Sequence, residues 1–328
     1  MAAVSHRNNR SVNRYADTMS RCKAAWWYKG NWASDAAITH DGDKLLALDT
    51  SIGLGIAAAG AAVLGSMLGL GGGVFLVPIF TLFFGVDARV AIAASAVAVV
   101  TNSVAGSSVH LRSGFTNIRL AMLLQVTTAI GAIAGAYVAI AAELDLIYGV
   151  FGVVLIASGI SMLVRRQAAV PNAPPDAPDP MQLRSEYVDP ATSRLIAYVP
   201  RRLPAGITVS GAAGVISGML GIGGGAVQVP AMNLLMHVPV KAAAGTSTFM
   251  VGMTAVASAL VFYADDLIDP RVVVPAMVGV FFGARIGSQL TRRVRTQNLV
   301  VVFVLILLYL GVSLVLRAFG ITLPGQQE

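Results

Sequence analysis

The distribution of charge along the chain restricts its fold more than any other feature of the sequence. All sixteen Asp and Glu residues lie outside the hydrophobic stretches or at their ends, and almost all Lys and Arg residues do the same. Several charge-free runs reach the roughly 20 residues that an α-helix needs to cross about 30 Å of hydrocarbon. The sequence therefore predicts an all-α polytopic membrane protein. The runs are 52–86, 90–109, 120–142, 146–164, 203–236, 242–264, 272–284 and 299–316.

Composition excludes a soluble enzyme and a disordered chain. Hydrophobic residues make up 56% of the 328 residues and charged residues 12%, whereas an ordinary soluble domain has about 45–50% and 25%. The net charge of +7 is explained by Lys and Arg in loops that face the cytoplasm, so no nucleic-acid partner is expected. The single cysteine, Cys22, excludes an intramolecular disulfide and a multi-cysteine metal site. No cofactor and no metal are expected.

The chain repeats itself at an offset of 152 residues. At that offset SMLGLGGGVFLVP (66–78) lies on GMLGIGGGAVQVP (218–230), and the register then holds without a gap over about 75 residues, which indicates a tandem duplication. The predicted organisation is a polar N-terminal extension, a first transmembrane repeat, a Pro-rich basic linker, a second transmembrane repeat and a short C-terminal tail. Their bounds are 1–50, 51–164, 165–203, 204–318 and 319–328.

Charges that flank the segments predict that the two repeats are inverted with respect to each other. Basic residues favour the cytoplasmic side; they flank the loop near 112–119, and they fill the linker and the loop near 292–295. Acidic residues dominate the loops near 143–145 and 265–269. With the basic loops inside and the N-terminus outside, the first two segments of each repeat must together return the chain to its starting side.

Three consecutive glycines separate a long first segment from a short second one in each repeat, at 71–73 and 223–225. They break the helix, and a hydrophobic chain tolerates such a break only where protein or water covers it. The short helix that follows offers free N–H groups and a positive dipole end, which suit an anion. We expect the two breaks to face each other and to bind substrate. The alternative is tight helix packing, which we do expect of the glycines at 131–135 and 279–287.

The repeated GxGGG motif, followed each time by an apolar stretch and a proline, resembles the TauE/SafE sulfite exporter family, as does the small-residue segment AAGTSTFMV. The resemblance covers about residues 51–318 and implies a membrane transporter of sulfite, sulfonates such as sulfoacetate, or other sulfur-containing or organic anions. It also implies about eight transmembrane segments in two repeats. That number agrees with three net crossings per repeat only if the first two segments form a re-entrant hairpin.

Neutral polar side chains in the charge-free segments are the further candidates for anion binding. Hydroxyl and amide groups can donate to an oxyanion without the cost of a second buried charge, although Ser and Thr also bond back to helix carbonyls. Arg285 is the one basic residue well inside a segment, and it either pairs with the anion or extends to the cytoplasmic surface. The candidate substrate-binding residues are Gly71, Gly72, Gly73, Gly223, Gly224, Gly225, Ser95, Asn102, Thr246, Ser247 and Arg285.

The sequence thus predicts a multi-pass protein of the inner membrane that moves a small anion by alternating access. It is not predicted to be an enzyme, because nucleophile and metal motifs are missing. The alternative is a membrane-embedded assembly or anchoring subunit without transport activity. The expected partners are a small anionic substrate and the lipid bilayer. Homo-oligomerisation, the substrate within the anion class, the transport direction and the coupling ion are left open.

Overall fold

The structure is a computed structural model, and it divides the chain into two compact units, Met1–Ala47 and Leu48–Glu328. The tryptophans of the N-terminal extension and the basic loop near 292–295 lie outside the described residues. The described residues are 44–68, 70–112, 114–165, 179, 181–189, 194–290 and 296–320.

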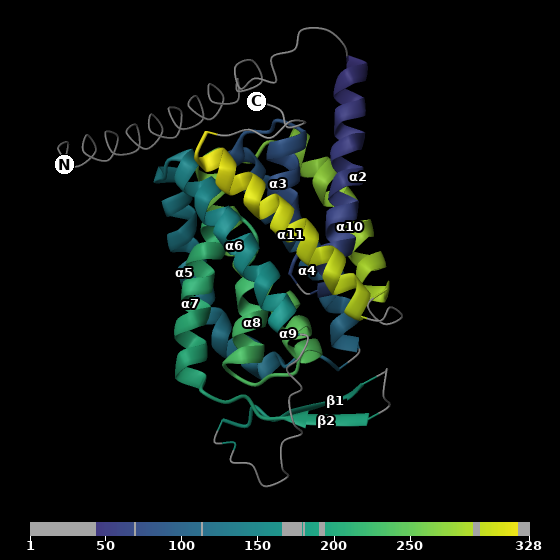
Figure 1. Ribbon diagram of the computed structural model, residues 1–328, viewed down its shortest axis with the longest axis vertical. Coiled ribbons are helices and arrows are strands. Elements are labelled where there is room, and N and C mark those ends of the chain that lie inside the picture. The colour runs from purple at the N-terminus through teal and green to yellow at the C-terminus, as the bar shows by residue number, and fades with distance from the viewer. Residues whose placement is uncertain are drawn as a thin grey trace, which may run out of the picture. The chain divides into compact units, whose positions relative to one another are not determined.

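The described part of the chain is built mainly of α-helices, and seven of them are long and apolar enough to cross a membrane. Helices satisfy their backbone hydrogen bonds internally, which hydrocarbon requires. The seven are α2 (Lys44–Leu68), α4 (Ala88–Arg112), α5 (Ile118–Ala141), α6 (Leu144–Arg165), α7 (Leu203–Leu220), α9 (Val240–Ala264) and α10 (Pro270–Leu290). Three further helices are α3 (Gly73–Phe83), α8 (Gly225–Leu234) and α11 (Thr296–Ala318). Figure 1 shows their arrangement.

Each glycine break joins a long helix and a short helix into an antiparallel hairpin. A Cβ on Gly65, near the end of α2, would collide with Gly72, whereas a Cβ on Gly53 would stand 3.2 Å from Phe84, just past α3. In the same way Gly206, near the start of α7, lies against Met236, just past α8. Both hairpins therefore return the chain to the end at which they begin, which an inverted arrangement of the repeats requires.

Glycine stripes hold the hairpins to the rest of the helices. A Cβ on Gly279, Gly283 or Gly287 of α10 would overlap backbone atoms of α2, one turn further along α2 each time. Gly131 and Gly135 of α5 meet α7 in the same manner. The prediction that these glycines serve tight helix packing is confirmed, because no side chain fits where two backbones approach this closely.

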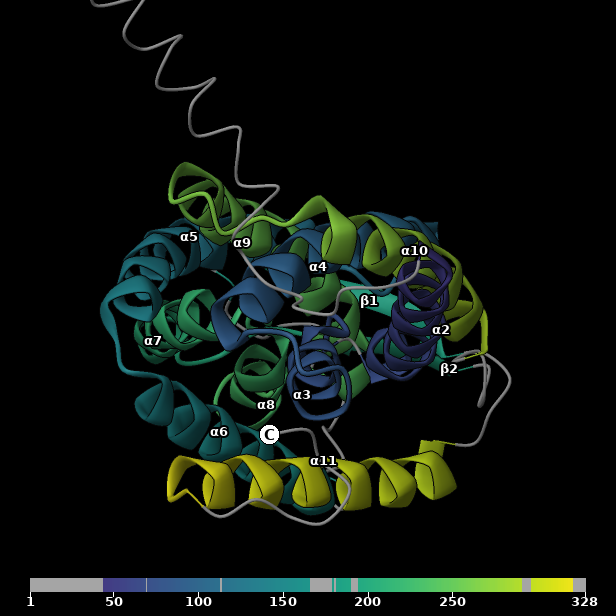
Figure 2. The same cartoon turned by 90° about the horizontal axis from the view of Figure 1, so that it is seen from above.

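Two further helix pairs connect the first half of the chain with the second. Gly106 of α4 faces Thr248 of α9, whereas Ser103 of α4 faces Gly252, so α4 and α9 run antiparallel. Helices α6 and α11 also run antiparallel and pack extensively on each other. Seen from above, the short helices α3 and α8 lie in the middle of the unit, surrounded by the longer ones (Figure 2).

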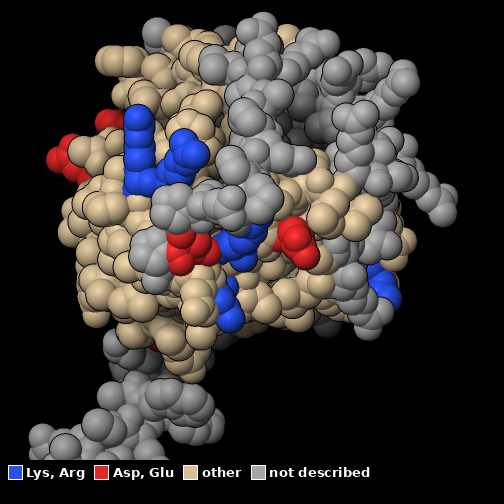
Figure 3. All heavy atoms as spheres, turned by 90° about the horizontal axis from the view of Figure 1, so that it is seen from below, with Lys and Arg blue, Asp and Glu red and all other residues tan. Residues whose placement is uncertain are grey.

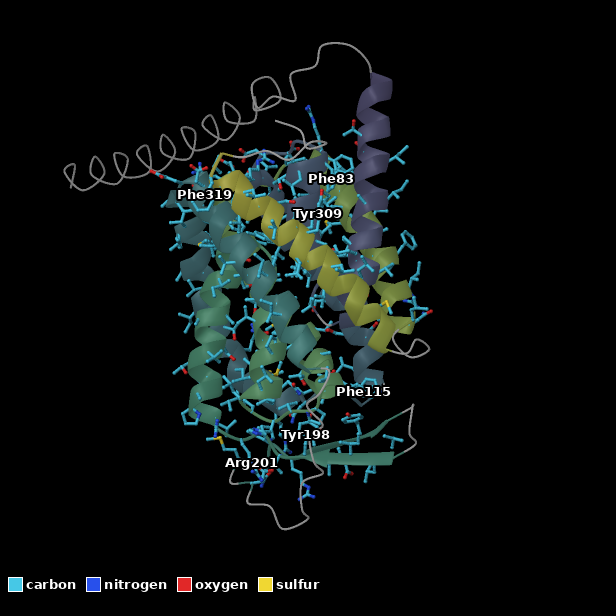
Figure 4. All side chains as sticks on the ribbon, in the orientation of Figure 1. Phe83, Phe115, Tyr198, Arg201, Tyr309 and Phe319 are labelled. Atoms are coloured by element: carbon cyan, nitrogen blue, oxygen red, sulfur yellow. The ribbon has the colours of Figure 1, made fainter. Side chains whose placement is uncertain are left out.

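The linker contains a β-hairpin that the sequence analysis did not predict. Strands β1 (Ser185–Asp189) and β2 (Arg194–Tyr198) pair antiparallel, with Ser185 opposite Tyr198. The ring of Tyr187 packs edge-on against Phe115 at 5.3 Å, and the amide of Asn117 donates to the carbonyl of Leu183 at 2.8 Å. The hairpin is thereby fixed to the loop between α4 and α5, at the lower end in Figure 4.

Apolar side chains cover much of the surface of the helices. Large hydrophobic residues are exposed along the outer faces, for example Val126 and Ile130 on α5, Leu260 on α9 and Ile286 on α10. On the face at the hairpin end, described Lys and Arg side chains lie next to a few acidic ones, among described residues that carry no charge (Figure 3). Such a surface suits a protein surrounded by hydrocarbon with charged ends in water.

Candidate functional site

The two glycine breaks have matching backbone geometry. The φ angles are 81° and 77° at Gly71 and Gly72, and 75° and 86° at Gly223 and Gly224, a left-handed conformation that glycine adopts without strain. Gly72 and Gly224 are the N-caps of α3 and α8, and neither helix receives a capping bond from a side chain. The first N–H groups of both helices therefore lack intrahelical partners, and each helix start carries about +0.5 of an elementary charge.

The two breaks are in contact with each other. A Cβ on Gly73 would stand 2.9 Å from Cα of Ile222, and one on Gly71 would stand 3.5 Å from the carbonyl oxygen of Ile222. Val99 of α4 and Val251 of α9 complete this centre and belong to one small buried cluster. The centre thus consists of backbone and two valines, with the polar groups placed around it. The expected meeting of the two breaks is present in the structure.

Two serines of α4 near the breaks form hydrogen bonds to carbonyls of the second half. The hydroxyl of Ser95 donates to the carbonyl of Gly221 at 3.0 Å, and that of Ser103 donates to the carbonyl of Thr248 at 2.6 Å. The Ser95 bond ties α4 to the start of the second glycine motif. Both serines therefore hold the two halves together, and Ser95 lies at the breaks as the sequence suggested.

Asn102 is the candidate residue whose polar atoms have no partner. Its side chain is 0% exposed, and neither the amide nitrogen nor the amide oxygen forms a hydrogen bond. The carboxamide carbon lies 3.9 Å from the position of a Cβ on Gly72, so the amide is next to the start of α3. A buried amide without partners costs about 1–3 kcal/mol, and the bond that a ligand forms with it recovers this cost.

The second break has different polar neighbours, Ser217 and Gln228, which were not among the predicted site residues. Ser217 of α7 is 1% exposed with an unpaired hydroxyl, and its Oγ lies 3.4 Å from the position of a Cβ on Gly224. Gln228 of α8 donates to Thr128 at 3.4 Å, and Gln125 of α5 donates to Thr254 at 3.3 Å. The available signal was the repeat offset, because Ser217 and Gln228 replace Gly65 and Leu76 of the first half.

Three other candidates are placed differently. Thr246 accepts the backbone N–H of Asn117 at 3.0 Å, so its hydroxyl holds the loop between α4 and α5 beside the linker hairpin. Ser247 is fully buried on α9. Arg285 is exposed on α10, whose glycines face α2, so the structure does not bring Arg285 together with the breaks. The buried polar side chains of the described residues are all Ser, Thr, Asn or Gln.

An apolar groove runs along the outside of α3, and its lining residues do not include the glycines of the break. It has a volume of about 510 Å³ and lies between α2, α3 and α11, with Phe75, Phe83 and Tyr309 among its lining residues. Ala61 also lines it, and the carbonyl of Ala61 lies 3.9 Å from the position of a Cβ on Gly72. Figure 4 shows Phe83 and Tyr309 near the end opposite the linker hairpin. At the second break α6 packs on α8.

Two broken helical hairpins that meet inside a multi-pass helical protein are characteristic of secondary membrane transporters. Comparison with known proteins agrees with this class. The chain belongs to the family described as Sulfite exporter TauE/SafE, which matches residues 54–314. It is therefore a member of a transporter family and not an enzyme.

Curated relatives cover most of the chain at low identity. A probable membrane transporter protein, YunE, of Bacillus subtilis (strain 168) is 24% identical over 78% of this chain and 93% of its own length. A probable membrane transporter protein of Xylella fastidiosa (strain 9a5c) is 26% identical over 77% of this chain and 90% of its own. The archaeal protein MJ0441 of Methanocaldococcus jannaschii, also a probable membrane transporter, is 22% identical over 77% and 91%. No solved structure matches the chain.

Proposed function

We propose that this protein is a permease that moves a small anion across the membrane by alternating access. The observation that carries the proposal is the contact between two glycine breaks, each followed by a helix start without a side-chain cap, with a buried amide without partners beside the first. Backbone N–H groups at a helix start bind anions without a basic side chain. The proposed site consists of Gly71, Gly72 and Gly73, Gly223, Gly224 and Gly225, with Ser95 and Asn102 beside them.

We also propose that residues 51–164 and 204–318 are inverted repeats joined by the 165–203 linker. Four helices of the second half, α8 to α11, each begin 152 residues after their counterparts α3 to α6. The counterpart pairs α4 with α9 and α6 with α11 are both antiparallel, as two inverted repeats require. Val99 and Val251 are also separated by 152 residues and share one cluster at the centre, which supports a symmetry axis between the breaks.

The chemistry of the site favours a sulfur-containing or organic anion over a cation. The described buried side chains include hydroxyl and amide donors but no carboxylate, the side-chain ligand that divalent cations such as Ca²⁺ and Mg²⁺ commonly use. Sulfite, a sulfonate and a carboxylate all carry oxygens that accept from N–H and O–H groups. The family description names sulfite, and sulfite and simple sulfonates are the first substrates to test.

Alternating access is supported by a difference between the two hairpins. Helix α6 packs on α8, and the hydroxyl of Ser158 reaches the carbonyl of Ala226 at 3.5 Å. Between α11 and α3, the counterparts of α6 and α8, lies the groove instead. In inverted repeats, the two halves can exchange these arrangements, so that α11 packs on α3 and a groove opens between α6 and α8. This exchange exposes the site to the opposite side of the membrane.

The test is anion flux into liposomes that contain the purified protein. The panel is sulfite, methanesulfonate, sulfoacetate, sulfate, acetate and chloride, with protein-free vesicles as the blank. Gly72→Ala should abolish most of the flux, because a methyl group at the start of α3 shields its N–H groups. Gly114→Ala is the matched control, since Gly114 has a similar φ of 69° in a loop with nothing near its Cβ position. No flux for any anion would favour an assembly or anchoring subunit.

A further inference from the structure

The first break offers its ligand both a hydrogen-bond donor and a hydrogen-bond acceptor. Asn102 is fully buried, and its amide nitrogen and amide oxygen are both unpaired. Whichever way the amide is turned, one NH₂ group and one carbonyl oxygen face the same surroundings. An oxyanion without hydrogen satisfies only the NH₂ group. A ligand that fits the whole amide must therefore accept a hydrogen bond and also donate one.

Polar residues near Asn102 already have hydrogen-bond partners, so a ligand is left to pair with its amide. Ser95 and Ser103, on the same helix, already donate to backbone carbonyls of the second half. At the position of Asn102 in the second half stands Thr254, which donates to the carbonyl of Met250 at 3.0 Å and accepts from Gln125. The structure thus has the uncommitted amide in the first half, while the corresponding hydroxyl in the second half has both a donor and an acceptor.

Electrostatics at the first break limits the charge of the ligand. The α3 helix start supplies about half an elementary charge, and every described buried polar side chain is neutral. Moving an ion into a low-dielectric interior costs several kcal/mol even after relaxation, and the cost rises steeply for a second charge. Charged groups on the helices that pack against α4 lie near helix ends or on an exposed face: Lys241, Arg271 and Arg285.

We propose that the first break binds an oxyanion in its protonated, singly charged form, and that Asn102 recognises the proton. The NH₂ group of Asn102 and the start of α3 donate to the charged oxygens, and the amide oxygen accepts from the O–H of the ligand. The proton then crosses the membrane on the substrate, so no carboxylate relay is needed within the spans. This inference rests on the proposed anion transport and adds the protonation state of the substrate.

The experiment compares three anions in the proteoliposome assay from mildly acidic to mildly alkaline pH. Sulfite changes from the protonated monoanion to the dianion over this range, methanesulfonate remains a monoanion without O–H, and sulfate remains a dianion. Flux of sulfite should follow the fraction of the protonated monoanion, after the diffusion into protein-free vesicles is subtracted. Methanesulfonate flux should be lower and independent of pH, and sulfate flux should be at the blank.

The decisive variant is Asn102→Leu, read as the ratio of sulfite to methanesulfonate flux at acidic pH. A site built to bind a ligand hydroxyl discriminates strongly against analogues that lack it, so the ratio should fall at least tenfold towards one. Using a ratio cancels differences in folding and insertion. Ser313→Ala is the control, because it removes an unpaired buried hydroxyl from α11, a helix that supplies none of the nearest neighbours of the break glycines; its ratio should be unchanged.

The outcomes separate the two proposals. Equal transport of sulfate and protonated sulfite, or an unchanged ratio in Asn102→Leu, would overturn the role of the proton while anion transport stands. A complete lack of flux for all three anions at every pH would overturn the anion transport on which the inference rests. A flux that follows the monoanion and a ratio that collapses only in Asn102→Leu would support it.

Discussion

The two glycine breaks have the same backbone conformation but differ in the side chains that surround them. Both begin a short helix from a left-handed glycine, Gly72 or Gly224, with no side-chain cap. The first has a free amide beside it and an apolar groove along its helix. The second has α6 packed on α8 and amides bonded to threonines. The comparison teaches that one backbone conformation can be surrounded by different side chains in the two halves, so that the polar groups near the two breaks are not equivalent.

The largest effect is expected from a methyl group at the contact between the breaks. In Gly223→Ala the new Cβ would stand 2.5 Å from Val251 and 2.8 Å from Val99, at a φ of 75°. Overpacking and backbone strain together should cost about 2–5 kcal/mol and lower the apparent unfolding temperature in detergent. Adding Val251→Ala should restore part of the loss. Gly60→Ala, where the Cβ meets nothing within 4 Å, should be neutral or slightly stabilising; equal losses in both variants would argue against this contact.

The corresponding residues Asn102 and Thr254 should respond in opposite ways. Asn102→Leu removes an unpaired amide and should leave the unfolding temperature unchanged or raise it, although anion flux falls. Thr254→Val leaves the Gln125 amide without its 3.3 Å partner and should cost about 1–3 kcal/mol, while flux per folded molecule and its selectivity remain. Thermal unfolding and flux measured on both variants check the contrast. Stabilities that fall equally would mean that Asn102 has a partner in the folded protein.

Filling the groove should slow transport without weakening binding. Gly60 lines the groove on α2, and Gly60→Leu places a side chain where α11 must close on α3 if the two halves exchange their packing. We expect flux to fall several-fold while the thermal shift produced by the substrate is retained. Gly149→Leu is a matched substitution on a helix, at the place where α6 packs on α11. Its Cβ position lies 3.8 Å from Ala318. Unchanged flux in Gly60→Leu would separate the groove from the transport cycle.

The smallest effect concerns the linker hairpin, which packs below the second break. Tyr198 belongs to the same buried cluster as Met232 and Met236 around the end of α8, and burial raises the pKa of its phenol. The neutral phenol stabilises the fold, so its contribution is complete below the ordinary pKa of about 10 and is lost as pH rises through the raised value. Tyr198→Phe should remove part of the alkaline loss of stability in a pH series of thermal unfolding, and an identical pH profile would contradict this role.

The sequence was sufficient to predict the helical segments, the two breaks and their meeting. Charge-free runs define the spans because hydrocarbon excludes charge. The glycine runs at 71–73 and 223–225 define the breaks because the first two glycines of each run adopt left-handed φ angles, which glycine does without strain. The tight packing of Gly283 and Gly135 followed from the four-residue spacing of small residues. These properties depend on local composition and period, which a single sequence displays directly.

Side-chain roles at the site could not be predicted in the same way. Ser95 and Asn102 look equally able to bind an anion in the sequence, yet Ser95 is bonded to a carbonyl of the other half and Asn102 is not. Whether a hydroxyl donates to a carbonyl of the other half depends on contacts between residues more than a hundred positions apart in the sequence. Thr246 and Arg285 show the same limit, because the helix face that each occupies is set by neighbours. The pairing of the two linker strands was not evident from the Pro-rich composition of the linker.

The contact between Val99 and Val251 has a consequence for how such a protein diverges. In a symmetric dimer a residue on the axis meets its own copy, so every substitution there changes both sides of the contact at once. When the two repeats are joined in one chain, each side of the axis is encoded separately. The valines have kept matching sizes at the centre, whereas one turn further along α4 and α9 the counterparts Asn102 and Thr254 differ. In the proposed repeat arrangement, fusion thus allows the side chains of one half to change independently of those of the other while the central contact is retained.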